Sequence, residues 1–429
     1  MNVSRPLWQG RVLALLGIVL FAFSLRSGVA SLSPLYEAIG DEFVLPPIII
    51  GLIGSAPPVC FAIFGLLTPS LERRFGLERL AVAVLVLSAI GLGLRAFSFS
   101  APMLLMSTVL MFIAVGVGNV LLPPLVKKYF ADRLGLMMTL YSTMMAISTF
   151  LPPLVAVPVA DAAGWRVSLG LWLVFVVAAL VPWLLLALRP SQVADAAVVK
   201  TSAESLDSTD PSVLATGPIA VTSARPNLLA RLWRIPLAWA TGLVLATSSF
   251  IAYTSFAWLP AILIDIAGVT PAQAGALLSL FGAIGLPCAL LVPILVVRWQ
   301  ATRPLFFIGA IGGVLGVLGL LFAPTAALPL WVVLLGMTGI MFPLGLVLMS
   351  VRARTHETAV ALSGFAQSVA YSVAAIFPPL VGVIHGLTDG WQVPLILLGV
   401  MLVLILPAGW IAGRRRTVED EWEARHGAW

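Results

Sequence analysis

Charged residues are scarce in this chain. Asp, Glu, Lys and Arg together make up 10% of its 429 residues, whereas 60% are hydrophobic and the mean hydropathy is +1.08. A soluble protein usually carries about 25% charged residues. The composition therefore excludes an ordinary soluble domain and predicts an all-α protein that crosses the lipid bilayer many times.

Cysteine and histidine are also rare, with two Cys and three His in the whole chain. Cys60 and Cys288 both stand in apolar stretches, so no disulfide framework is expected. His356, His385 and His426 lie away from the centres of the apolar stretches. The sequence has no His/Asp/Glu cluster suited to catalysis and no GxxxxGK[ST] motif. We therefore expect neither an enzyme nor a primary pump, with no cofactor and no bound metal. A receptor is not expected either, because the polar stretches are too short for a signalling domain.

Apolar windows of about 20 residues predict twelve membrane helices. The N-terminal run is too long for a signal peptide and lacks a small-residue cleavage site, so it is interpreted as a retained helix. The predicted helices are 12–35, 47–71, 80–98, 102–126, 134–159, 167–188, 236–260, 271–297, 304–323, 328–350, 358–384 and 392–412. A polar, partly disordered linker, 189–234, separates a six-helix bundle at 1–188 from a second at 235–413, and a tail follows at 414–429.

The basic residues predict the orientation of these helices. Of the 24 Lys and Arg residues, all but Arg26, Arg95 and Arg166 fall in the termini, the linker and the loops on one side of the membrane. Arg95 and Arg166 are assigned to the opposite side, and Arg26 lies inside an apolar stretch. By the positive-inside rule, both termini and the linker are cytoplasmic. The net charge of +6 follows from this topology and does not indicate nucleic acid as a partner.

The two halves of the chain repeat each other. Asp41, Pro47, Gly51, Pro69 and Arg74 recur at one constant offset as Asp265, Pro271, Gly275, Pro293 and Arg298, and Phe150–Trp165 aligns without gaps to Ile376–Trp391. Each repeat has an even number of helices, so both copies insert in the same orientation. Parallel repeats around an axis along the membrane normal place a substrate site near the midplane, between the halves.

Arg26 is the only charge in the stretch Val12–Leu35. At about 1.5 Å per residue it lies about 21 Å from the start of a helix that crosses about 30 Å of hydrocarbon. An arginine at this depth costs several kcal/mol unless it faces protein, water or an anion. It either bonds structurally to backbone carbonyls or a neighbouring helix, or binds an anion in a central cavity, and we prefer the anion-binding interpretation.

A few polar side chains on otherwise apolar helices are candidates to complete such a cavity. For each of them, packing with one local hydrogen bond is the alternative role. Trp258 is interpreted as a membrane-interface residue, with a gating role as the alternative. The candidate substrate-binding residues are Arg26, Asn119, Tyr141, Tyr253, Gln367 and Tyr371.

Local motifs also show a resemblance to a known protein family. The segments Gly118–Phe130, Thr139–Thr143, Phe256–Leu263 and Arg352–Gly382, with SLRSGVASLSPL around Arg26, resemble the cyanate / 2-nitroimidazole transporter family of the major facilitator superfamily. The resemblance implies the major facilitator fold, with twelve transmembrane helices as two parallel six-helix repeats. It also implies a transporter of the bacterial inner membrane.

Two functions remain open from the sequence. The first is secondary or facilitative transport of a small anion, cyanate-like or a small carboxylate, by alternating access with Arg26 as the anion-binding residue. The second is export of neutral nitroimidazole-like or drug compounds. All 18 acidic residues lie in predicted loops, tails or helix ends. Because proton relays ordinarily need a buried acid or histidine, we expect uniport or exchange, or symport in which the substrate carries the proton. The expected partners are a small, anionic substrate and the lipid bilayer, and a monomer is expected.

Overall fold

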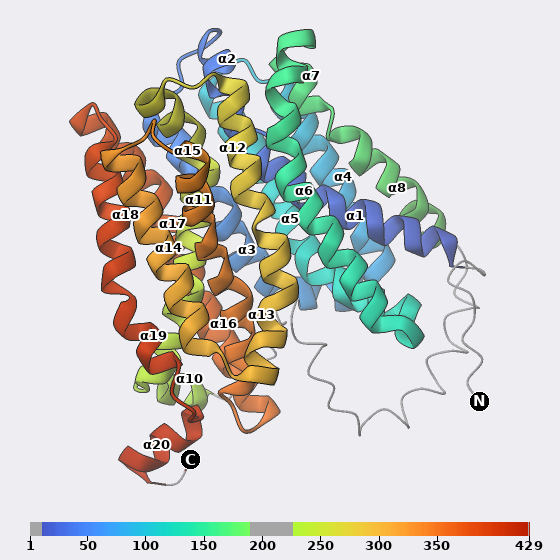
Figure 1. Ribbon diagram of the computed structural model, residues 1–429. Coiled ribbons are helices and arrows are strands. Elements are labelled where there is room, and N and C mark those ends of the chain that lie inside the picture. Colours follow the sequence, from blue (N-terminus) through green and yellow to red (C-terminus); the bar gives the residue numbers. More distant parts are fainter. Residues whose placement is uncertain (1–10, 189–225, 428) are drawn as a thin grey trace.

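The computed structural model describes residues 11–188, 226–427 and 429, and in these residues it contains helices and no strands (Figure 1). Two groups of helices stand side by side, one from each half of the chain. This arrangement confirms the predicted all-α fold of two six-helix bundles. The bounds below follow the described residues.

The N-terminal half contains six crossings built from long apolar helices. Its first crossing, α1, is followed by the short elements η1 and α2, and its last is split into α7 and α8. The elements are α1 Val12–Ala30, η1 Ser33–Leu35, α2 Tyr36–Gly40, α3 Pro47–Phe75, α4 Leu77–Ala96, α5 Ala101–Phe130, η2 Ala131–Arg133, α6 Leu134–Ala163, α7 Trp165–Gly170 and α8 Leu173–Ala187.

The C-terminal half repeats this order and adds one helix before its first crossing and one after its last. The elements are α10 Pro226–Trp233, α11 Pro236–Ala267, α12 Pro271–Ala283, α13 Gly285–Trp299, α14 Thr302–Phe322, α15 Leu328–Gly336, η5 Met337–Ile340, α16 Met341–Val351, α17 His356–Thr388, α18 Gln392–Leu404, α19 Leu406–Ala412 and α20 Val418–His426.

The described residues hold eleven helical stretches long and apolar enough to span a membrane. One of them, Ala101–Ala163, contains both α5 and α6. The chain turns between these helices, because Phe130 and Arg133 leave the helical region with φ near −136° and −137°. Counting α5 and α6 separately gives the twelve crossings that the sequence predicts.

Some crossings are interrupted where glycine or proline weakens the helix. The predicted helix 271–297 divides into α12 and α13 at Ile284, next to Gly285 and Pro287. The last crossing divides into α18 and α19 at Ile405, with Pro407 in the first turn of α19. Proline lacks the N–H group that would continue the hydrogen-bond ladder, so it favours such breaks.

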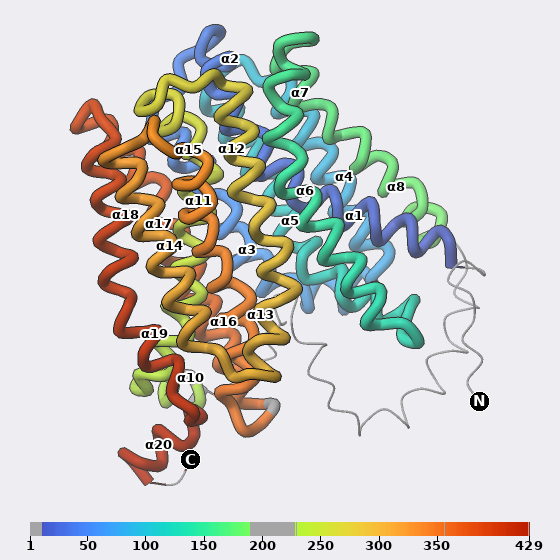
Figure 2. The backbone as a smooth tube through the Cα atoms, viewed as in Figure 1, coloured from blue at the N-terminus to red at the C-terminus, as the bar shows by residue number. Residues whose placement is uncertain are grey.

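The bundle has two distinct ends (Figure 2). The proximal end carries the start of α1 together with α10 and α20, and the distal end carries α2, α7 and the start of α12. Helices of the two halves lie close together at the distal end and diverge toward the proximal end. The site described below lies between these halves.

Repeat-equivalent residues hold the two halves together at the distal end. A Cβ atom added at Gly51 of α3 would lie 2.5 Å from the Cα of Pro379 in α17, and one added at Gly275 of α12 would lie 2.6 Å from the carbonyl oxygen of Pro153 in α6. Gly51 corresponds to Gly275 in the repeat, and Pro153 corresponds to Pro379. Each half therefore presses a glycine of one helix against a proline of the other half, and only glycine leaves room for this approach.

Two serine hydroxyls reinforce the same pair of contacts. Ser55 of α3 donates a hydrogen bond of 2.5 Å to the carbonyl of Ala375 in α17. Ser279 of α12 donates one of the same length to the carbonyl of Phe150 in α6. Ser55 and Ser279 are again equivalent in the repeat. The contacts are thus related by the internal symmetry that the sequence predicts.

Trp258 does not lie at the membrane interface, contrary to its preferred interpretation from the sequence. Its side chain is 2% exposed, and its indole N–H donates a 2.9 Å hydrogen bond to the carbonyl of Pro378. Trp391, beside it at 5.5 Å between ring centroids, donates to the carboxylate of Asp265. Packing of α11 against α17 therefore buries the indole of Trp258 inside the C-terminal half.

The helices α10 and α20 close the proximal end of the C-terminal half. Arg354, which precedes α17, pairs with Asp420 and Glu423 of α20, and its backbone N–H donates to Glu419. The guanidinium of Arg231 in α10 lies 5.3 Å from the ring centre of Trp422. Residues 189–225 of the predicted linker lie outside the described residues.

The docking of α20 is expected to weaken in acid. The backbone N–H of Thr417 and the Arg354 guanidinium lower the pKa of Asp420 from 3.8 to about 2. Because the folded-state pKa is depressed, this stabilisation is present above pH 3.8 and is lost as the pH falls toward 2. The Asp420→Asn variant should mimic this loss at neutral pH. Since the carboxylate is largely exposed, the effect should be modest. We expect amide hydrogen exchange in α20 to become about fivefold faster.

The matched control for this measurement is Arg416→Gln, which changes an exposed charge next to α20. Hydrogen exchange followed by mass spectrometry resolves α20 from the membrane helices. Unchanged exchange in Asp420→Asn would contradict the assigned role of this carboxylate.

Candidate functional site

Arg26 lies in the last two turns of α1, half-buried on a helix that packs against α6, α8 and α5. The surrounding residues of α1 are almost all apolar or small, and several are fully buried, such as Phe21, Ala22 and Leu25. The apolar sequence makes this helix insert, and its packing inside the bundle holds the guanidinium away from the proximal end. The structure thus places Arg26 within the membrane-crossing part of the fold, as the sequence predicts.

A phenylalanine ring lies against the Arg26 guanidinium. Its carbon Cζ lies 5.6 Å from the ring centre of Phe61 in α3, within the range of a cation–π interaction. The Phe61 ring packs edge-on against Phe112 of α5, with 6.3 Å between the centroids. No sequence pattern singled out Phe61, because a phenylalanine in an apolar helix is ordinarily a lipid-facing or core residue.

Three of the candidate tyrosines gather around the same charge. Tyr141 of α6, Tyr253 of α11 and Tyr371 of α17 all lie within the electrostatic reach of Arg26, and the Tyr253 hydroxyl lies beside its guanidinium. Tyr141 and Tyr253 are 1% and 8% exposed and share one apolar cluster with Phe61. Helices from both halves therefore meet at Arg26.

Gln367 and Asn119 are less directly connected with Arg26. The Gln367 amide donates a 3.1 Å hydrogen bond to the Ser363 hydroxyl, one turn earlier on α17. Asn119 is 4% exposed on α5, the helix that packs against both α1 and α3. Within the described residues, neither side chain has a hydrogen bond to Arg26. Their predicted role in binding remains a prediction.

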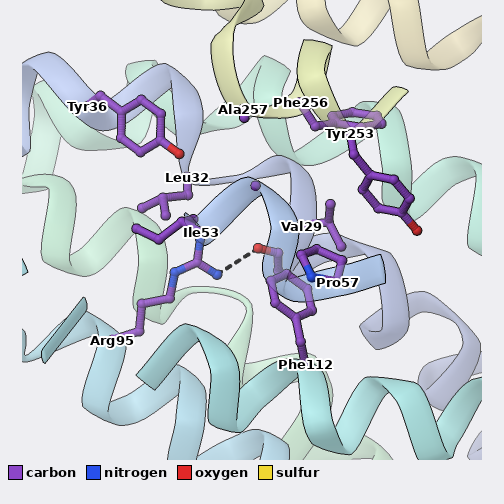
Figure 3. Close-up of a pocket in the computed structure, with 12 residues that line it drawn as sticks. Val29, Leu32, Tyr36, Ile53, Pro57, Arg95, Phe112, Tyr253, Phe256 and Ala257 are labelled. Atoms are coloured by element: carbon purple, nitrogen blue, oxygen red, sulfur yellow. Dashed lines mark hydrogen bonds between the residues drawn. The ribbon is translucent and has the colours of Figure 1, made fainter. Parts of the chain in front are cut away.

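A small pocket adjoins these residues on the distal side (Figure 3). Residues of the N-terminal half form most of its wall, and Tyr253, Phe256 and Ala257 of α11 complete it. Its free space admits about one water-sized molecule. Since the walls come from both halves, the pocket widens if the halves separate at this end.

Arg95, which charge counting assigned to the side opposite the termini, lines this pocket. It stands in the last turn of α4, within the predicted helix 80–98, and is 1% exposed. Its Nη1 donates a 2.6 Å hydrogen bond to the carbonyl of Gly28, two residues after Arg26 (Figure 3). This hydrogen bond joins the last turn of α4 to the end of α1.

The site has positively charged side chains without carboxylate partners among the described residues. In the described part of the chain, no carboxylate forms an ion pair with Arg26 or Arg95, and Asp and Glu stay at the ends of the membrane-crossing helices. No group of His, Cys, Asp and Glu in the described residues could hold a metal ion. The arrangement offers positive charge, hydroxyl groups and aromatic faces, and these can bind a small planar molecule or anion without reacting with it.

Comparison with known proteins agrees with the fold. The family model described as Major Facilitator Superfamily matches residues 15–375. The 2-nitroimidazole transporter of Escherichia coli (strain K12) is 32% identical over 413 residues, which cover 96% of this chain and 98% of the relative. The cyanate transport protein CynX of the same organism is 25% identical over 88% of this chain and 91% of its own.

A solved structure shows the same fold. The crystal structure of a bacterial homologue of the human lysosomal transporter Spinster superposes with a TM-score of 0.70 at 15% sequence identity. The match covers 96% of this chain and 98% of the other. The fold, the repeat and the family match agree, and the chain therefore belongs to the Major Facilitator Superfamily of multi-pass membrane transporters.

Proposed function

We propose that this transporter moves a small monovalent anion across the bacterial inner membrane by alternating access, with Arg26 as the anion-binding residue. The observation that carries the proposal is the half-buried Arg26 guanidinium, which has an aromatic and tyrosine environment and no carboxylate partner in the described residues. An uncompensated cation in hydrocarbon is costly. A bound anion would compensate the charge, and the removal of that cost would favour binding.

The shape of the site favours a compact, planar anion. The guanidinium is a planar fork that bonds well to two acceptor atoms at once. The Phe61 ring lies 5.6 Å away, and the tyrosine hydroxyls supply further donors. Cyanate, nitrate and small carboxylates have the size and the acceptor atoms that such a site would bind.

The names of two relatives bear on the class of substrate. One is named a cyanate transport protein and therefore handles a small anion. Another is named a 2-nitroimidazole transporter, which is the observation in favour of a second candidate, export of a neutral nitroheterocycle. The two names are chemically compatible, because the nitro group acidifies the ring N–H and part of the 2-nitroimidazole is anionic near neutral pH. Binding of that anion at Arg26 would unite both.

Transport itself would proceed by relative motion of the two halves. The distal end is held closed by the symmetric glycine–proline and serine–carbonyl contacts. By the positive-inside rule, the proximal end with the termini is cytoplasmic, so the distal end faces outward. The chain would act as a monomer in the lipid bilayer. Because the membrane-crossing helices described here carry acids only at their ends, uniport, exchange or symport with a protonated substrate fits better than a carboxylate relay.

A pair of nitroimidazoles distinguishes the two candidates. Uptake of 2-nitroimidazole and of its 1-methyl derivative, which cannot ionise, is measured in proteoliposomes between pH 5 and 9. The anion mechanism predicts that 2-nitroimidazole uptake rises with its ionised fraction and that the methyl derivative is not carried. Equal transport of both compounds by wild type and by Arg26→Gln would overturn the proposal in favour of neutral export.

Tyr253→Phe is expected to weaken substrate binding without unfolding the protein. The hydroxyl beside Arg26 is lost, whereas the ring that packs in the apolar cluster is kept. A hydrogen bond to a charged group contributes about 1.5 kcal/mol, so the KM for anion uptake should rise about tenfold. Tyr129→Phe, at the proximal end of α5, is the matched control. An unchanged KM in Tyr253→Phe would remove this hydroxyl from the site.

A further inference from the structure

The distal pocket contains a charge that the central site does not use. The guanidinium of Arg95 points into the pocket from the end of α4 (Figure 3). It is 1% exposed, and its Nε atom is buried without a hydrogen-bond partner. Its Nη1 bonds only to the Gly28 carbonyl and, weakly, to the sulfur of Met111.

These contacts leave Arg95 incompletely compensated. A carbonyl and a thioether carry no full negative charge, and no carboxylate in the described residues pairs with the guanidinium. An arginine buried in this way is costly unless an anion or a further acceptor reaches it. Its unpartnered Nε and its position on the pocket wall leave a donor available to a ligand in the pocket.

The pocket lies next to the Arg26 site. Tyr253 lines the pocket and also lies within the electrostatic reach of Arg26. Tyr36 forms another part of the pocket wall, within the electrostatic reach of Arg95. Arg95 and Tyr253 thus line one pocket from opposite sides, and Tyr253 belongs to the surroundings of Arg26 as well (Figure 3).

We propose that Arg95, Tyr36 and Tyr253 form an outer binding site for a small monovalent anion, which is occupied when the distal end opens and which exchanges the anion with Arg26. The inference rests on the proposed anion transport and extends it to a second position along the path. With the distal end closed, the pocket has room for about one water molecule. Its walls belong to different halves, so they would separate when the distal end opens.

The test is cyanate binding to purified protein in two conformations. Replacing Gly51 and Gly275 by Trp blocks the distal contacts and exposes the pocket, and the opening is confirmed beforehand from the distance between spin labels. In this distally open protein, Arg95→Gln should weaken cyanate binding about tenfold, because one charged donor pair is lost. In the protein with native glycines, where the pocket is closed, the same substitution should change binding less than about twofold.

A second variant separates the charge from the hydrogen bond to Gly28. Arg95→Lys keeps the positive charge but lacks the planar fork, so it should retain most of the cyanate affinity of the open protein. Equal weakening by Arg95→Gln in both conformations, or a Lys variant that behaves like Gln, would assign Arg95 a purely structural role and overturn the proposal. The Arg26→Gln variant tests the proposed function separately, because it should lose cyanate binding in the closed protein. Failure of the Arg26 proposal can therefore be distinguished from failure of the Arg95 proposal.

Discussion

Replacing Arg26 by Gln is expected to abolish anion uptake, with a loss of at least about a hundredfold. Removal of a charged partner from a buried ionic contact costs about 3 kcal/mol or more, which corresponds to this factor. The protein should remain folded, since Gln relieves the cost of a buried charge and Arg26 has no carboxylate partner among the described residues. Uptake of labelled cyanate into proteoliposomes measures the effect, and size-exclusion chromatography checks the fold.

Two matched variants make this result specific. Arg79→Gln removes the same charge from an exposed position at the start of α4 and should transport normally. Arg26→Lys keeps the charge but loses the planar fork, so it should retain partial uptake with a raised KM. Normal uptake by Arg26→Gln would remove Arg26 from the substrate path and return it to a structural role.

The double variant Gly51→Trp and Gly275→Trp is expected to stop transport by a different route. Even a Cβ atom at these positions would lie 2.5 Å from the Cα of Pro379 and 2.6 Å from the carbonyl oxygen of Pro153. Because backbone cannot yield as a flexible side chain does, an indole there must hold the halves apart at the distal end. We expect uptake to fall at least about fiftyfold, while anion binding persists, since no substituted residue touches Arg26.

Spin labels report the expected conformation directly. Labels at Asp161→Cys, exposed in the last turn of α6, and at Thr325→Cys, exposed in the loop after α14, should move apart in the double variant, with Cys60 and Cys288 replaced beforehand. The pair Gly93→Trp and Gly285→Trp is the control, because a Cβ at either position meets nothing within 4 Å. Full transport by the double variant Gly51→Trp and Gly275→Trp would contradict this role, because it would show that transport does not require the distal glycine–proline contacts.

The internal repeat is where the sequence predicted the architecture best. The matches Gly51 with Gly275 and Pro153 with Pro379 predicted only duplication, yet the structure joins these four residues into two equivalent contacts. Long apolar periodicity also predicted the crossings, because the bilayer requires a fixed helix length. The pairing of glycine with proline across the halves could not be predicted, since it depends on how the bundles dock.

Parts of the candidate site were harder to predict for reasons of tertiary packing. Charge counting gave only the side of the membrane for Arg95, because its burial and its hydrogen bond to the Gly28 carbonyl depend on tertiary packing. Gln367 shares a helix face with Ser363 as well as with Tyr371, and it bonds to the serine. Trp258 was assigned to the membrane interface because the sequence shows its position near a helix end. The sequence does not show its hydrogen-bond partner, the Pro378 carbonyl.

Ligand-dependent thermal stability of the purified protein is the sharpest test of anion binding at Arg26. Cyanate, nitrate, small carboxylates and 2-nitroimidazole are each titrated against wild type, Arg26→Gln and Arg79→Gln. A ligand that binds only the folded state raises the Tm by mass action. If Arg26 binds the anion, at least one of these anions stabilises wild type and Arg79→Gln and leaves the Tm of Arg26→Gln unchanged. Stabilisation by a neutral heterocycle that survives in Arg26→Gln would contradict this role.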